Sequence, residues 1–244
     1  MLELWRRRFG SCVATVAVTD RGDGDVHPLR VPVGVLRDRQ RASTGRIWRM
    51  MDQVHGIDAV MPPGPSPGAA TGPSTGTSTG TSTGPPAVVG VGDVLVGDGH
   101  SAIAVWAADC APLMLFAPDG TPTGCHAGWR GLSAGVVDVA VAACGSPVAA
   151  VLGPTIHPCC YEFAPPEIER VAAGIAVDRD RIASSTSWGS PALDVPAAVA
   201  LALAAHGVGL DVVGPCTGCD DRWFSHRRGD SGRHAVVAWN EAAA

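Results

Sequence analysis

A turn near the middle of the chain is flanked by reactive side chains at equal distances. Pro118-Asp119-Gly120 has the composition of a tight turn, and residues 113–117 and 121–125 beside it are typical of two hairpin strands. Cys110 lies eight residues before Pro118 and His126 lies eight residues after it. A regular hairpin would place this thiol opposite the imidazole, with Cβ atoms about 5 Å apart. The sequence therefore predicts an active site in which the pair either shares a metal or acts as a nucleophile with its base.

A histidine ahead of the hairpin is a candidate third member of this site. His55 belongs to the segment Asp52-Gln53-Val54-His55-Gly56, and its spacing alone favours an ordinary loop histidine. Together with Cys110 and His126, however, it completes a set of two nitrogens and one sulfur. Three protein ligands and one open position are typical of a catalytic zinc site. We therefore expect these three residues to bind Zn²⁺.

The hydrophobic patterns elsewhere in the chain predict a mixture of strands and helices. Strands are expected over residues 88–96, 103–107, 148–152 and 236–239, and helices over residues 132–144, 166–175 and 194–206. Asp194 is expected to cap the last helix, with Pro196 tolerated in its first turn. Because hairpins and helices are mixed without regular βαβ alternation, the sequence predicts an α+β fold.

One stretch cannot contribute to a packed core. Residues 62–86 are nearly all Pro, Gly, Ser, Thr and Ala, with a repeated Ser-Thr-Gly-Thr unit. Ordering such a segment costs backbone entropy without burying apolar surface. We expect a flexible surface insertion, and we expect residues 1–244 to form a single domain, since the apolar strands after the insertion can pair within the same body.

Composition and charge disfavour several classes of protein. The 244-residue chain has a formal net charge of −5, which disfavours non-specific nucleic-acid binding, and its basic clusters are short. No apolar segment near the N-terminus is typical of a signal peptide, and no run approaches the roughly 18 apolar residues that span a membrane. The eight scattered cysteines indicate reduced thiols in a cytoplasmic protein. The sequence is compatible with a monomer and does not assign an oligomeric state.

A series of motifs resembles one known family. The Gln53-Val54-His55-Gly56 segment is followed by Ala108-Asp109-Cys110-Ala111-Pro112 and then by the highly specific element His126-Ala127-Gly128-Trp129-Arg130-Gly131. Shorter matches come in the same order at Leu152-Gly153-Pro154-Thr155-Ile156, Tyr161-Glu162, Leu193-Asp194, Cys216-Thr217, Phe224-Ser225-His226-Arg227-Arg228 and Gly232-Arg233. Over roughly residues 50 to 240, the chain resembles the bacterial multifunctional purine nucleoside phosphorylases, formerly called polyphenol oxidases or laccase-domain proteins.

This resemblance implies a zinc-dependent enzyme that cleaves adenosine, inosine and methylthioadenosine with phosphate and also deaminates adenosine. The metal ligands of the family map onto His55, Cys110 and His126, with copper as a possible occupant in vitro. Asp109 and Arg130 match neighbouring motif positions. The fold implied is a compact α+β domain with mixed sheets flanked by helices, similar to the catalytic domain of the cytotoxic necrotizing factor toxins, which use a Cys–His pair.

The N-terminal region departs from the family pattern. Members usually carry T-R-x-G-G, an S-L-N-L-G-like segment and an N-R pair, whereas here only Thr19-Asp20-Arg21-Gly22-Asp23-Gly24 is a loose match. The stretch before Cys216 and the loop at Phe224 is also shortened. If the missing segment lines the substrate pocket, activity would be altered with the metal ligands intact, so a catalytically inactive member is one alternative.

Phosphorolysis needs an anion site that holds phosphate in line with the anomeric carbon. Arg130, close to His126, is the first candidate because a guanidinium binds phosphate bidentately. Arg21, Arg227 and Arg228 are further candidates. Asp109 is expected to orient a metal ligand or the Arg130 guanidinium. For deamination, zinc would lower the pKa of bound water to about 7.

Two rival functions belong to other classes. A multicopper oxidase needs histidines in His-x-His pairs, and this chain has eight histidines without such a pair. A Cys–His hydrolase or deamidase, with Cys110 as nucleophile and His126 as base, is harder to exclude. Such a nucleophile would alkylate readily and would work after chelation.

The remaining cysteines carry weaker signals. Cys216-Thr217-Gly218-Cys219 is a lone C-x-x-C pair, which is weak evidence for a metal site. Cys159 and Cys160 could supply a second pair for a structural zinc, but we favour ordinary thiols at all four positions. Cys125 is expected to face the core, on the side of its strand opposite to His126.

Overall fold

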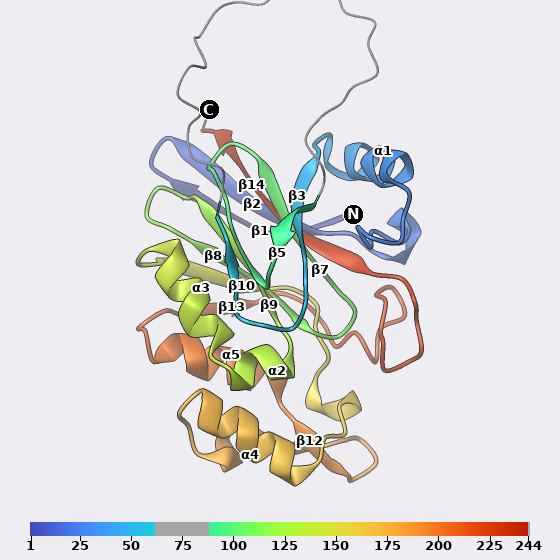
Figure 1. Ribbon diagram of the computed structural model, residues 1–244, viewed down its shortest axis with the longest axis vertical. Coiled ribbons are helices and arrows are strands. Elements are labelled where there is room, and N and C mark those ends of the chain that lie inside the picture. The colour runs from blue at the N-terminus through green and yellow to red at the C-terminus, as the bar shows by residue number, and fades with distance from the viewer. Residues whose placement is uncertain (62–87, 244) are drawn as a thin grey trace, which may run out of the picture.

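Two six-stranded sheets are packed face to face in the described part of the chain (Figure 1). The computed structural model describes residues 1–61 and 88–243, so the expected insertion at residues 62–86 lies outside the described residues. The first sheet has the order β1 (Leu2–Phe9), β2 (Cys12–Val18), β14 (His234–Ala242), β7 (Ala102–Ala107), β3 (Trp48–Asp52), β5 (Val88–Val91). The second has the order β13 (Leu210–Val212), β10 (Ala149–Leu152), β8 (Ala111–Phe116), β9 (Pro122–Ala127), β6 (Val94–Val96), β4 (Ala59–Val60).

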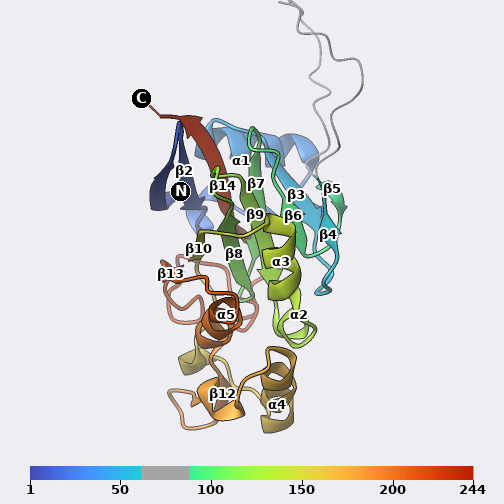
Figure 2. The ribbon, with the colours of Figure 1, turned by 90° about the vertical axis from the view of Figure 1, so that its left-hand side faces the viewer.

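Helices cover the outer faces of both sheets (Figure 2). Helix α1 (Val33–Thr44) packs on the first sheet through Leu36, which lies in one cluster with Trp48 and Val237. On the second sheet lie α2 (Trp129–Ser133), α3 (Val136–Cys144) and α5 (Val195–Ala204), and α4 (Pro165–Gly174) packs against α2. Short elements complete the described chain: the strands β11 (Ala183–Ser185) and β12 (Pro191–Leu193) and the 3-10 helices η1 (Arg21–Asp23), η2 (Pro158–Cys160) and η3 (Arg179–Arg181). This mixture of sheets and helices is the α+β fold that the sequence predicts.

The central strand β8 is apolar throughout because both of its faces are buried. Successive side chains of a strand point to opposite faces. Leu113 and Leu115 pack against the helices, whereas Met114 and Phe116 pack between the two sheets. Cys125 on β9 belongs to the helix-side core, as predicted.

The hairpin register differs from the prediction by two residues. Phe116 pairs with Pro122 and Pro112 pairs with His126, so the turn is centred on Asp119 rather than on Pro118. The turn is closed by a hydrogen bond from the Gly120 amide to the Ala117 carbonyl, with Gly120 at a φ of 86°. Cys110 therefore precedes β8 and lies diagonally from His126 instead of directly opposite to it.

Glycines interrupt two of the predicted elements. The expected strand over residues 88–96 breaks after Gly92, where a Cβ would lie 2.5 Å from the carbonyl oxygen of Asp58, and its halves β5 and β6 belong to different sheets. The expected helix over residues 132–144 is divided at Gly135, which has a φ of 85°. The other predicted strands and helices are confirmed to within a few residues.

Several expectations lie beyond these observations. The likeness to the toxin catalytic domain and the single-domain organisation stay predictions. No helix among the described residues combines the length and the apolar character needed to cross a bilayer.

Asp194 begins α5 as predicted, since its side chain accepts a hydrogen bond of 2.9 Å from the Ala197 amide. Asp194→Ala removes this acceptor and should lower the free energy of unfolding by about 1 kcal/mol in urea denaturation. Asp178→Ala is the matched control, because Asp178 precedes η3 without a capping hydrogen bond from its side chain. Equal losses in the two variants would contradict the capping role.

Candidate active site

His55, Cys110 and His126 come together from three different segments of the chain. Their ligand atoms all lie within 4.8 Å of one another. Cys110 Sγ is 3.8 Å from His55 Nε2, and the two imidazole centroids are 4.8 Å apart with an angle of 78° between the rings. The structure therefore brings together the three residues that the sequence singles out, although the predicted hairpin register was wrong.

Asp93, which was not among the sequence-predicted site residues, connects two of the three. It is 0% exposed and lies at the break between β5 and β6. Its Oδ1 accepts hydrogen bonds from His126 Nδ1 at 2.7 Å and from the His55 amide at 3.0 Å. Its Oδ2 accepts from the amides of Gly56 at 2.6 Å and Val54 at 3.3 Å. An acidic residue within an apolar predicted strand was the sequence signal for this role.

Two strained backbone positions orient the cluster. His55 has a φ of 63° and Asp109, directly before Cys110, has a φ of 93°, a region that costs a non-glycine residue on the order of 1 kcal/mol or more. Asp93 holds the first position through three consecutive amides. The second is held by the Asp109 carbonyl, which accepts hydrogen bonds from Thr155 Oγ1 at 2.6 Å and the Ile156 amide at 2.9 Å.

Cys110 and His126 stabilise each other as a thiolate and an imidazolium. Burial disfavours the thiolate, but the positive charge of His126 and hydrogen bonds from His126 and His55 lower the pKa of Cys110 to about 6. Burial also disfavours the imidazolium, but the charge of Cys110 and the hydrogen bond to Asp93 raise the pKa of His126 to about 9. A thiolate is the form of cysteine that binds metals and attacks electrophiles.

Gly128, two residues after His126, packs tightly against the cluster. A Cβ on Gly128 would lie 3.0 Å from His55 Cδ2 and 3.2 Å from Cys110 Sγ. Any side chain at Gly128 would therefore push on two members of the cluster. This contact gives a physical reason for a glycine in the His126-Ala127-Gly128 motif.

The cluster opens into a cavity of about 700 Å³, a size typical of small-molecule sites. One wall is aromatic: the Trp129 and Phe163 rings meet edge to face at 5.4 Å, and Tyr161 lies 5.0 Å from Phe163. Burial and the nearby charge of Cys110 raise the pKa of Tyr161 above its usual range, so its hydroxyl remains a proton donor. Such a wall suits a flat aromatic ligand.

Four arginines also line this cavity: Arg30, Arg130, Arg227 and Arg233. The Arg130 guanidinium lies over the Trp129 ring at 4.5 Å, and that of Arg227 lies over the Tyr161 ring at 5.1 Å. Within the described ranges, none of the four forms an ion pair with a carboxylate. Their charge is therefore available to an anionic ligand.

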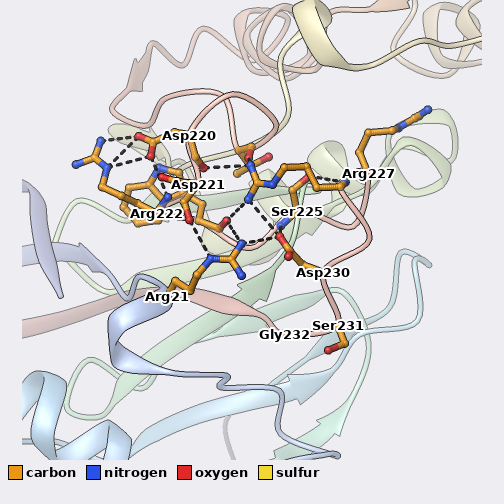
Figure 3. Close-up of polar contacts among 12 residues, drawn as sticks. Arg21, Asp220, Asp221, Arg222, Ser225, Arg227, Asp230, Ser231 and Gly232 are labelled. Atoms are coloured by element: carbon orange, nitrogen blue, oxygen red, sulfur yellow. Dashed lines mark hydrogen bonds and ion pairs between the residues drawn. The ribbon is translucent and has the colours of Figure 1, made fainter.

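Two of the arginines predicted to bind phosphate, Arg21 and Arg228, lie outside the cavity lining. Arg21 Nη2 is 2.7 Å from Asp230 Oδ2, and Arg228 donates to the carbonyls of Thr217 and Trp223. Figure 3 shows the Arg21 side chain directed into this network, whereas Arg227 extends away from it. Neither Arg21 nor Arg228 lines the cavity, because their guanidinium groups bind the segment between Thr217 and Asp230.

Arg30 and Arg233 were not predicted as site residues. Both donate to the carbonyl of Ser231, at 2.9 Å from Arg30 and 3.0 Å from Arg233. Burial and the neighbouring charge of Arg30 lower the pKa of Arg233. Arg233 stands in the Gly232-Arg233 motif, which was a signal for its involvement. Arg30 had no such signal, because only the folded chain brings residue 30 to the cavity.

The carboxylate of Asp109 binds a loop of the cavity. It accepts hydrogen bonds from Thr217 Oγ1 at 2.6 Å and from the Arg227 amide at 2.7 Å, so it holds the loop that carries Arg227. Asp109 directly precedes Cys110, and its backbone has the positive φ described above. The expectation that Asp109 orients a metal ligand or the Arg130 guanidinium stays a prediction.

Comparison with known proteins gives consistent matches along most of the chain. Residues 32–241 match the family model described as multi-copper polyphenol oxidoreductase laccase. Purine nucleoside phosphorylase ORF3 of Streptomyces griseus is 36% identical over 221 residues, which cover 85% of this chain and 81% of the relative. Purine nucleoside phosphorylase SCO2081 of Streptomyces coelicolor is 33% identical over 202 residues, which cover 79% and 74% of the two chains.

Solved structures share the fold over nearly the whole chain. Neisseria meningitidis protein NMB0706 superimposes with a TM-score of 0.71 at 22% identity and covers 98% of this chain and 99% of its own. YlmD of Geobacillus stearothermophilus superimposes with a TM-score of 0.67 at 25% identity, covering 95% and 92%.

The role of Asp93 can be tested through stability. Asp93→Asn keeps the shape but loses the buried charge that four N–H groups share, so the free energy of unfolding should fall by about 2–4 kcal/mol. Asp119→Asn is the control, because Asp119 is exposed and its side chain accepts one amide hydrogen bond, from Thr121 at 2.8 Å. Urea denaturation should show a loss of about 1 kcal/mol or less for this control. A comparable loss in both variants would contradict a special role for Asp93.

Proposed function

Because the chain belongs to the family described as multi-copper polyphenol oxidoreductase laccase, whose curated relatives are named purine nucleoside phosphorylases, we propose that it is a zinc-dependent enzyme of that kind. It would cleave adenosine, inosine and methylthioadenosine with phosphate, and it would deaminate adenosine. The observation that carries this proposal is the cluster of His55, Cys110 and His126, which opens into a cavity lined by aromatic rings and unpaired arginines. A cytoplasmic setting is part of the proposal, since Cys110 must stay reduced.

The three side chains fit a zinc ion. Cys110 favours the thiolate, and His126 Nδ1 is bonded to Asp93, which leaves its Nε2 for a metal. A carboxylate behind a histidine is the usual support of a zinc ligand. Among the described residues this cluster alone offers histidines to a metal, and it offers two, fewer than a multicopper centre needs. Zinc would supply a Lewis acid and a bound water with a pKa of about 7.

The cavity wall can bind both substrates of a phosphorolysis. A purine would stack on the aromatic wall of Trp129, Tyr161 and Phe163. Phosphate would be held by Arg130 and Arg227, whose guanidinium groups have free donors. Asp109 directly precedes Cys110, and its carboxylate holds the Arg227 amide. The proposed phosphate site would therefore stay at a fixed distance from the proposed metal site. In this proposal Arg21 and Arg228 support the loop that carries Arg227 and do not bind phosphate.

A Cys–His hydrolase or deamidase remains a second candidate because of a specific observation. Asp93, His126 and Cys110 are arranged as an acid, a base and a thiol of lowered pKa, which is the order of a nucleophilic triad. In that reaction Cys110 would form a covalent intermediate and no metal would be needed.

Metal analysis separates these two functions. Cys110→Ala and His126→Ala should each contain about one zinc fewer per chain than the parent, measured by elemental analysis, because a site with two ligands binds weakly. Asp93→Asn should bind zinc 10- to 100-fold more weakly. His206→Ala is the control, since His206 pairs with Asp138 and is not a member of the cluster, so this variant should keep its zinc. Unchanged zinc in Cys110→Ala, or turnover that survives chelation and is lost when Cys110 is alkylated, would favour the hydrolase.

Arg130 tests the phosphorylase proposal directly. Arg130→Lys keeps the charge but loses the bidentate fork, so phosphorolysis efficiency should fall about ten- to hundredfold. Deamination uses water instead of phosphate and should suffer less. Adenine and inosine formation would be measured side by side with a melting curve, and Arg170→Lys on the exposed side of α4 would be the control. Equal loss of both products in a destabilised variant would remove Arg130 from the phosphate site.

A further inference from the structure

Four cysteines from two loops meet outside the cavity. Cys159 and Cys160 lie in η2. Cys216 and Cys219 lie in the turn that precedes the loop with Arg227 and Arg228. The parallel bridge between Thr155 and Cys216 brings these loops side by side. The structure thus brings together two cysteine pairs that are more than fifty residues apart in the sequence.

The four sulfurs have the spacing of a tetrahedral metal site. All of them lie within 4.8 Å of one another, with Cys219 Sγ 3.4 Å from Cys159 Sγ and 3.3 Å from Cys160 Sγ. A zinc–sulfur distance of about 2.3 Å places the sulfurs of a Cys₄ site about 3.8 Å apart. The two separations from Cys219 Sγ are slightly shorter than this value, the others do not exceed 4.8 Å, and all four cysteines are free thiols.

The backbone around the cluster is shaped for converging sulfurs. The amides of Cys219 and Asp220 both donate to the Cys216 carbonyl, at 3.2 Å and 3.1 Å, and this turn brings the two sulfurs of the C-x-x-C segment to the same cluster. Gly218 must be a glycine, since a Cβ there would lie 2.6 Å from Cys160 Cβ. The His157 amide donates to Cys216 Sγ at 3.3 Å, which satisfies a lone pair on a sulfur that is almost fully buried.

The donor atoms of the cluster select a soft metal. All four groups are thiols, and thiolate ligands favour zinc and other soft metals over Mg²⁺ and Ca²⁺.

We propose that Cys159, Cys160, Cys216 and Cys219 bind a structural zinc ion, separate from the His55–Cys110–His126 site. Four protein ligands leave no open position, which is typical of structural rather than catalytic zinc. The ion would tie the loop that leads to Tyr161 to the loop that carries Thr217. Because Thr217 donates to Asp109, the second zinc would brace one wall of the cavity.

The experiment uses the full chain in a Cys110→Ala background, so that its outcome does not depend on the proposed catalytic metal. The background protein, purified under reducing conditions, should retain about one zinc per chain. Adding Cys219→Ser, at the exposed member of the cluster, or Cys160→Ser should remove it. Adding Cys144→Ser should leave zinc unchanged, because Cys144 is a partly buried thiol at the end of α3 outside the cluster. Cobalt-substituted background protein should show strong thiolate charge-transfer absorption that Cys219→Ser abolishes.

A second measurement covers the case in which the serine variants do not fold. Treating the folded background protein with a mercurial reagent should release about one zinc per chain, detected with a colorimetric chelator. Absence of zinc from the background protein, or unchanged zinc in both serine variants, would overturn the proposal. So would an intact mass lower by two or four hydrogens that reductant restores, since this mass would show disulfides in the cluster.

Discussion

The buried carboxylate of Asp93 is the interaction on which the rest of the site depends. Burial alone would raise its pKa, but the hydrogen bond and charge of His126 and the amides of Gly56 and His55 lower it. These donors come from the loop after β3 of the first sheet and from β9 of the second. A single charge therefore holds His126 by its ring and His55 by its backbone, and it connects the two sheets at the cavity.

The site lies where chain segments leave the regular strands. Cys110 directly precedes β8, and Asp109 before it is held at a positive φ by the segment after β10. The rigid hairpin fixes one side, while loops from distant parts of the chain supply Arg30, Tyr161 and Arg227. A stable sandwich thus positions a cavity whose chemistry comes mainly from loops, which is a common arrangement in enzymes.

Both the hairpin spacing and the family motifs predicted the cluster of His55, Cys110 and His126. The predicted hairpin register and the predicted strand over residues 88–96 were wrong for physical reasons. The apolar run of β8 and the turn residues predicted the hairpin. The centre of the turn depends on the φ values of the loop residues, which the sequence pattern does not give. With Gly120 at a positive φ, the turn is centred on Asp119. The expected strand over residues 88–96 looked continuous because both of its halves are rich in valine, although only β6 is buried and Val91 on β5 is 62% exposed. Gly92 and Asp93 divide it, and the acidic residue placed there became the support of the histidines.

The sequence by itself determined the local features of this protein. The cap at Asp194, the two faces of β9 and the family motifs with Cys110 and His126 depend on neighbouring residues and on side-chain types. Only the tertiary structure decided that Asp93 reaches His126, that Arg30 and Arg233 meet at one carbonyl, and that Arg21 and Arg228 bind a loop. It also decided that two cysteine pairs converge. These contacts join segments far apart in the chain, so they follow from how the sheets and loops pack and not from local spacing.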